Sequence, residues 1–215
     1  MQNKITMKSI SNERFLSEEN LILLNSFLGA TVTSFDIDQS QYVYCNPQNM
    51  SIEAAWPGVI TLISHNGKKP ILNLDFSGEK TLDKYGYEVI NLRIYESKKD
   101  YSKGKGIWIS WFEVNKIEIY SNLSTDILDS NTFFINPAVD FVKSHDCHEL
   151  EYIDNSDEIL LLHSSANQRI MLQVIESLNG SIIMHFNEAH IDKILTNKFY
   201  FDSPKKNYVK RLTLQ

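Results

Sequence analysis

The chain has few cysteines, prolines and glycines, the residues that are abundant in disulfide-rich, proline-rich and collagen-like proteins. Its 215 residues include two cysteines, five prolines and eight glycines. Two cysteines cannot form a disulfide framework, and so little glycine and proline excludes collagen-like sequences. Eleven Phe, ten Tyr and three Trp supply more apolar bulk than a disordered chain carries. The length therefore predicts a globular protein with a sizeable core.

Segments that target or cross a membrane are also missing. The first twenty residues hold no apolar signal-peptide core, and the apolar run Leu21–Leu24 is followed by Asn25. Four residues are far fewer than the ~20 that span a bilayer. We expect a cytoplasmic protein with Cys45 and Cys147 reduced and with no membrane partner.

Positive charge is scarce. Lys and Arg total 21 against 27 Asp and Glu, a net charge of −6. A generic nucleic-acid binder needs a positive field, so nucleic acid is not an expected partner. The only arginines are Arg14, Arg93, Arg169 and Arg211, which leaves few bidentate clamps for phosphate or carboxylate ligands.

Catalytic and cofactor-binding motifs are absent. There is no phosphate-binding loop, no G-x-G-x-x-G and no G-x-S-x-G. His148-Glu149 begins like a zinc-protease motif, but Tyr152 stands where the second histidine is required. Strands and helices do not alternate either, which argues against nucleotide binding on a doubly wound sheet.

Residue periodicity predicts an α+β protein dominated by antiparallel β-sheet. Ser17 as an N-cap and Gly29 as a stop predict an N-terminal helix over 17–28. Two short helices are expected at 137–143 and 188–195. Period-two alternation predicts strands at 31–36, 41–45, 59–64, 70–76, 88–95, 106–120, 149–153, 158–163, 169–176, 181–187 and 208–214, with turns at Asn66-Gly67 and Asn179-Gly180.

The expected organisation is a flexible leader over 1–16 and one globular domain over 17–215. A weak internal sequence similarity suggests a division of that domain, because Leu62-Ile63-Ser64-His65 resembles Leu160-Leu161-Leu162-His163. We therefore consider two similar β-rich halves, 17–122 and 137–215, joined by a connector over 123–136. Two unrelated hairpins would share much of the same pattern.

The one local concentration of metal-ligand residue types is His145-Asp146-Cys147-His148. Two imidazoles and a thiolate suit zinc, with His163 or Cys45 as a fourth ligand. A thiol beside histidines also admits nucleophilic catalysis. The alternative is a polar helix end with one half-buried thiol. No other cofactor is expected.

The negative charge of the chain is concentrated in one stretch. Residues 140–158 carry seven acids and one lysine, a local net of −6. Such a stretch can steer a basic protein partner. The residues assigned to that contact are Asp146, Glu149, Glu151, Asp154, Asp157 and Glu158. A solvated edge with protective charges is an alternative, and the tail from Lys198, with a net of +4, could pair with the stretch inside the molecule.

Two smaller sites are weaker candidates. Asp36 and Asp38 could hold a cation or divide acid and base roles, but an Asp-rich turn explains them more simply. His65 and His163 both follow apolar strands. Either histidine would need a partner within reach to act in catalysis.

Aromatic residues crowd the strand expected at 106–120. Trp108 shares a strand face with Phe112, and Trp111 shares the opposite face with Ile109. Bulky residues on both faces indicate a central strand covered on both sides, so core positions are expected for both tryptophans. An exposed tryptophan here would instead be an interface anchor.

The favoured function is a non-enzymatic cytoplasmic protein-binding module. Small acidic β-rich proteins without catalytic motifs often serve as immunity proteins, which neutralise a toxin that is commonly basic, and the analogy is one of class alone. A metal-dependent or thiol hydrolase centred on His145, Cys147 and His148 is the alternative. A β-sandwich that binds carbohydrate through aromatic platforms such as Trp108 comes third.

Overall fold

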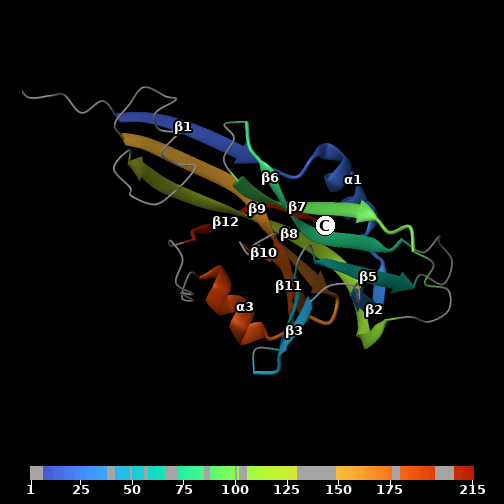
Figure 1. Ribbon diagram of the computed structural model, residues 1–215. Helices are drawn as coiled ribbons and strands as arrows, with labels where there is room; N and C mark the ends of the chain where they lie inside the picture. Colours follow the sequence, from blue (N-terminus) through green and yellow to red (C-terminus); the bar gives the residue numbers. More distant parts are fainter. Residues whose placement is uncertain are drawn as a thin grey trace, which may run out of the picture.

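The computed structural model describes residues 7–37, 42–48, 50–55, 58–65, 72–84, 88–99, 101, 106–129, 149–175, 180–196 and 206–215. These ranges contain twelve strands and two helices (Figure 1). The strands are β1 (Met7–Arg14), β2 (Thr31–Ile37), β3 (Tyr42–Asn46), β4 (Ser51–Ala55), β5 (Val59–His65), β6 (Leu74–Leu82), β7 (Glu88–Glu96), β8 (Ile107–Asp129), β9 (Glu149–Ser164), β10 (Arg169–Ile175), β11 (Ser181–His185) and β12 (Tyr208–Leu214). The helices are α1 (Glu18–Ser26) and α3 (Glu188–Leu195).

All twelve strands belong to one sheet, which confirms the expectation of a mostly antiparallel β protein. The strand order is β3-β4-β11-β10-β9-β8-β2-β5-β6-β7, with β1 beside β9 and β12 beside β8. Only the β1–β9 pair is parallel among the described strands. The order also interleaves the two halves of the chain, because β4 pairs with β11.

The sheet folds back on itself around the main core. β6 and β7 contact β9, β10 and β11, and most of the enclosed side chains come from nine strands and α1. Two glycines, Gly78 and Gly180, lie where β6 and the start of β11 approach each other most closely. A Cβ on Gly78 would lie 2.8 Å from the Ser181 carbonyl oxygen, and one on Gly180 would lie 2.6 Å from the Gly78 carbonyl oxygen.

β9 is covered on both faces, which explains its continuous apolar run. Leu160 and Leu162 point into the main core. Ile159 and Leu161 point into a second cluster with Ile191 and other residues of α3 and β10. Alternate residues of a strand face opposite sides, so a strand between two apolar layers has no polar face.

The two helices begin at the residue types that favour helix starts. Ser17 accepts a hydrogen bond from the Asn20 N–H at 3.2 Å, and Asn187 accepts one from the His190 N–H at 3.1 Å. The prediction of 188–195 is confirmed, and the N-terminal helix is three residues shorter than predicted. The helix expected at 137–143 lies outside the described residues. Neither described helix is long and apolar enough to cross a membrane.

Three segments differ most from the sequence-based expectation. Met7–Arg14, placed in a flexible leader, forms β1 and pairs with β9. Positions 123–129, placed in a connector, continue β8 along β9. Ser51–Ala55, where no strand is predicted, forms β4. Each pairs with a strand distant in sequence, although β4 also pairs with its neighbour β3. Backbone hydrogen bonds between distant strands leave no local pattern.

Candidate functional site

β9 holds the acids that the sequence analysis assigned to partner binding. Asp154, Asp157 and Glu158 are all buried. The register between β8 and β9 shifts after Tyr120, so that Glu158 is a bulge residue without a partner on β8. Asp157 and Glu158, the two acids at this bulge, both contact the C-terminal segment of the chain.

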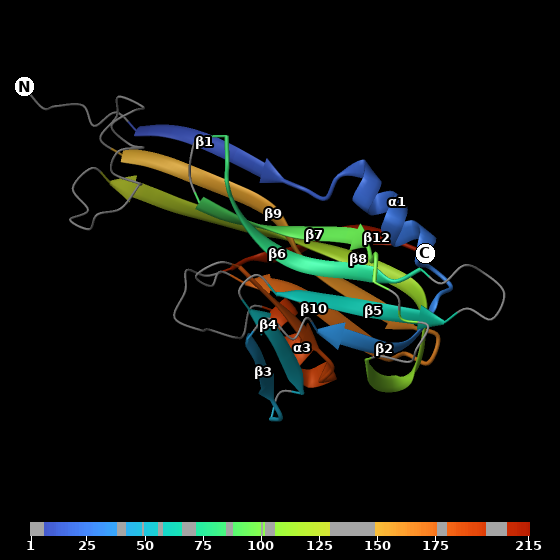
Figure 2. The same cartoon turned by 45° about the vertical axis from the view of Figure 1, so that its right-hand side comes forward.

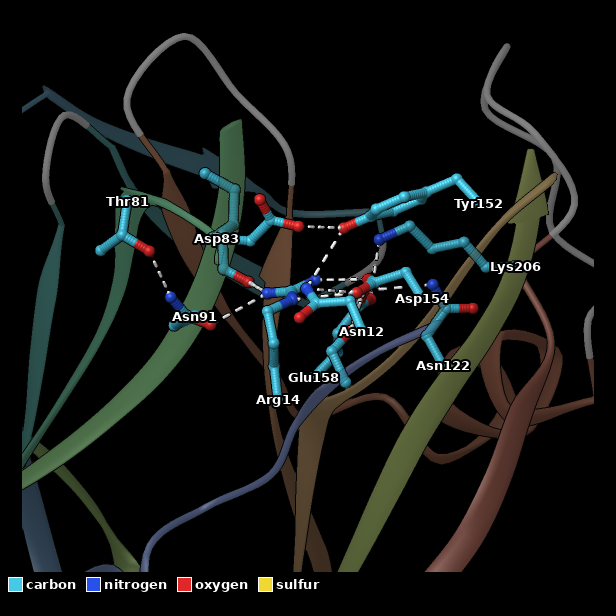
Figure 3. A network of polar contacts seen from close by, with 12 residues as sticks. Asn12, Arg14, Thr81, Asp83, Asn91, Asn122, Tyr152, Asp154, Glu158 and Lys206 are labelled. Atoms are coloured by element: carbon cyan, nitrogen blue, oxygen red, sulfur yellow. Dashed lines mark hydrogen bonds and ion pairs between the residues drawn. The ribbon is translucent and has the colours of Figure 1, made fainter. Parts of the chain in front are cut away.

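Asp154 is paired with Arg14 of β1 (Figure 3). The guanidinium donates from Nε to Oδ1 at 3.0 Å and from Nη2 to Oδ2 at 2.5 Å, a bidentate geometry. Its Nη1 also donates to Asn91 Oδ1 at 3.0 Å and to the Ile90 carbonyl on the edge of β7. Burial alone would lower the pKa of Arg14, but the hydrogen bond and charge of Asp154 raise it above the ordinary value.

Asp157 is paired with Arg211 of β12. The Arg211 Nε and Nη2 donate to its two oxygens at 2.8 and 2.5 Å. Ser121 Oγ donates to Oδ1 at 2.7 Å, and the Leu16 backbone N–H donates to Oδ2 at 2.8 Å. The carboxylate therefore ties the C-terminal strand to the segment between β1 and α1.

Glu158 is paired with Lys206, whose Nζ lies 2.7 Å from Oε2 (Figure 3). Tyr208 donates to the same oxygen at 3.1 Å, while Asn122 and Ser156 each donate to Oε1 at 3.2 Å. The basic tail thus pairs with the acidic stretch inside the molecule, as one alternative predicted. Carboxylates that are buried and paired in this way do not present free charge to solvent, and removing their cations would leave a buried charge without compensation.

The remaining acids of the predicted contact lie elsewhere. Glu149 and Glu151 are half-buried on β9, and neither forms an ion pair within the described part of the chain. Asp146 lies outside the described residues, as do the three candidate zinc ligands His145, Cys147 and His148. The residues that are described contain no group of three or more metal-ligand side chains.

His163 does have a partner within reach, which the sequence could not show. Its Nε2 lies 2.9 Å from Glu118 Oε2. Lys116 and Lys210 donate to the other oxygen of Glu118 at 3.2 and 3.0 Å. Burial alone would raise the pKa of Glu118, but the hydrogen bonds from Lys210, His163 and Lys116 lower it to about 2. Because an ionised carboxylate only accepts, Nε2 of His163 carries the proton.

A polar cavity of about 290 Å³ lies beside this pair and is lined in part by Lys116, His163 and Arg169. Burial lowers the pKa of His163, although the hydrogen bond with Glu118 favours its protonation. The imidazole is therefore neutral near pH 7, and its Nδ1 makes no hydrogen bond to any described residue. Such an oriented nitrogen can act as a base.

The other small sites remain single residues. Asp36 accepts a hydrogen bond from the Tyr101 hydroxyl at 3.1 Å, and Asp38 lies outside the described residues. His65 is exposed at the end of β5. Neither Asp36 nor His65 belongs to a metal-binding group within the described ranges.

The expectation that Trp108 and Trp111 are core residues is wrong. They are 71% and 76% exposed. β2 pairs Val32 with Phe112 but Ser34 with Trp108. The interval from Val32 to Ser34 on β2 is two residues long, whereas the facing interval from Trp108 to Phe112 on β8 is four residues long. The additional residues of β8 form a bulge. Strand alternation fails across such a bulge, which is why both indoles reach solvent while Phe112 stays buried.

Sequence reasoning missed a buried chain of polar side chains beside α3. His185 Nε2 lies 3.2 Å from Gln173 Oε1, and Gln173 Nε2 donates to the Tyr208 hydroxyl at 2.9 Å. The chain then continues to Glu158. Burial, with a smaller contribution from His190, lowers the pKa of His185 to about 3. In the sequence, the only sign of this buried polar chain is a polar residue at an inward-facing position of an otherwise apolar strand.

Comparisons with protein-family models, with curated proteins and with solved structures found no match to this chain. The function therefore has to be argued from the site itself.

Proposed function

We propose that the chain is a non-enzymatic cytoplasmic protein-binding module and that the bulge of β8 is its contact surface. The observation that carries the proposal is the exposure of Trp108 and Trp111. Tryptophan is enriched among the few residues that supply most of the energy of a protein interface. The neighbouring Ile107 is also exposed, which extends the apolar surface.

The backbone that carries the two tryptophans is held at both ends of the bulge. β8 pairs with β2 on both sides of the bulge. Phe112 and its partner Val32 are buried in the main core, which anchors one end. A contact surface that is rigid before binding loses less conformational entropy when the partner docks.

Charge has a smaller part in this proposal than the sequence suggested. Three of the six predicted acids are neutralised by Arg14, Arg211 and Lys206. Glu149 and Glu151 remain to steer a basic partner. A basic toxin, neutralised in the manner of an immunity protein, is the partner class that we propose.

The test is an affinity measurement with the captured partner, for which the product of the gene immediately upstream is the first candidate. Trp108→Ala and Trp111→Ala should each raise Kd by at least ~30-fold, the effect of removing a hot-spot side chain. Leu82→Ala is the matched control, because Leu82 is an exposed apolar residue on β6. Equal affinities for all three variants would contradict the proposal, and Trp-dependent binding of a glycan would favour the carbohydrate-binding hypothesis instead.

A second candidate is a hydrolase that uses His163 as a base, favoured by the Glu118 contact and the adjacent cavity. Metal analysis of the purified protein tests the zinc version, in which His145, Cys147 and His148 join the site. Stoichiometric zinc that disappears in His148→Ala would support it. A metal-free protein would contradict it.

A further inference from the structure

The described sheet has four strands with a neighbour on one side only: β1, β3, β7 and β12. Three of these carry charged residues, and the Ile90 carbonyl of β7 is also occupied by Arg14. β3 has the sequence Tyr-Val-Tyr-Cys-Asn and carries no charge. Proteins usually protect their sheet edges with charge, proline or a covering element, so β3 is the exception in this molecule.

Three consecutive side chains of β3, those of Val43, Tyr44 and Cys45, are exposed. Val43 and Tyr44 are 45% and 67% exposed, and Cys45 is exposed as well. Because consecutive residues of a strand point to opposite faces, neither face of β3 is covered at these positions. β3 lies at the outermost end of the sheet, beyond β4 (Figure 2). Packing within one chain therefore does not explain its aromatic and β-branched residues.

We propose that β3 is a self-association edge, at which two copies of the chain pair antiparallel and continue the sheet. β3 is compatible with its own copy, because it carries no charge. Each chain carries a net charge of −6, yet an uncharged strand brings no like charges opposite each other when it meets its own copy. An acidic or basic partner segment would find no opposite charge on β3. This inference does not depend on the tryptophan surface.

A two-fold axis through Tyr44 gives the simplest register. Tyr44 then lies opposite Tyr44 of the second copy, and Val43 lies opposite Cys45. Aromatic residues facing each other across an antiparallel pair stabilise it, whereas like charges in that position destabilise it. The two-fold arrangement is also the commonest symmetry among soluble oligomers.

Analytical ultracentrifugation under reducing conditions tests the proposal, over protein concentrations that rise from low micromolar. The natural chain should dimerise, and Val43→Lys or Tyr44→Lys should raise the dimer dissociation constant at least ~10-fold. Val209→Lys is the matched control, because Val209 is an exposed valine on the charged edge strand β12. Its dimer should persist. All three sites are at the surface, and circular dichroism will check that the variants fold.

A charge swap tests the register itself. Tyr44→Lys and Tyr44→Glu should each be monomeric alone, and an equimolar mixture should recover the dimer. A natural chain that is monomeric at every concentration would overturn the proposal, as would a dimer unaffected by Val43→Lys and Tyr44→Lys. Failure of the mixture to associate would overturn the register through Tyr44.

Discussion

Replacement of Arg14 by methionine is expected to destabilise the protein severely, because it leaves a buried carboxylate without its cation. The side chains of Arg14 and Asp154 are 11% and 10% exposed. After the change, Asp154 keeps two hydrogen-bond donors among the described residues, Asn12 at 3.3 Å and Ser156 at 3.4 Å. Removing one partner of a buried ion pair typically costs about 3–5 kcal/mol. That is a large part of the ~5–15 kcal/mol that stabilises a domain.

Urea denaturation monitored by circular dichroism measures this cost. Arg93→Met is the matched control, because Arg93 lies 2.6 Å from Glu79 in a pair whose side chains are 47% and 54% exposed. An exposed pair contributes less than ~1 kcal/mol. The double variant Arg14→Met/Asp154→Leu should recover most of the lost stability, since no uncompensated charge remains. Equal costs for Arg14→Met and Arg93→Met, or no recovery in the double variant, would show that the Asp154 carboxylate does not depend on its buried cation.

Three further perturbations test other buried polar groups. The pKa of His185 falls from 6.5 to about 3, so the unfolded state binds the proton first as the pH drops. The free energy of unfolding should therefore fall by up to ~1.4 kcal/mol per pH unit below pH 6.5, and His185→Gln should flatten this slope in denaturation experiments. The pKa of Glu118 is lowered from 4.5 to about 2. The natural chain should therefore have a higher free energy of unfolding than Glu118→Gln, by a difference that is full above about pH 5 and vanishes near pH 2. A difference in unfolding free energy that stays unchanged at low pH would contradict this. Tyr208→Phe leaves the Gln173 amide without its acceptor and should cost about 1–3 kcal/mol, measured by thermal unfolding, and an unaltered melting temperature would show that water replaces the hydroxyl.

Local patterns predicted the elements whose signals are local. The helix over 188–195 follows from its Asn187 cap and its apolar spacing, and the antiparallel pairing of β10 with β11 agrees with the expected turn at Asn179-Gly180. By contrast, β1 contains Ser, Asn, Glu and Arg and is held by a parallel partner more than a hundred residues away. No periodicity within β1 distinguishes it from a loop.

The same distinction explains the errors at the candidate sites. The acidic stretch was visible in the sequence, but its burial depends on a bulge at Glu158 and on cations supplied by β1 and by the C-terminal segment. Strict alternation predicts buried tryptophans, but the register of β2 against β8 interrupts that alternation. Register is a property of two strands together, so one strand's sequence does not contain it.

Protection of the tryptophans on partner binding tests the proposed contact surface most directly. Trp56 is first replaced by phenylalanine, so that fluorescence reports only Trp108 and Trp111. In the free protein acrylamide should quench both efficiently, because both indoles are exposed. Saturation with the partner should reduce that quenching strongly, since hot-spot residues lose their water on binding. Quenching that is unchanged in the saturated complex would contradict the proposal that the β8 bulge binds the partner.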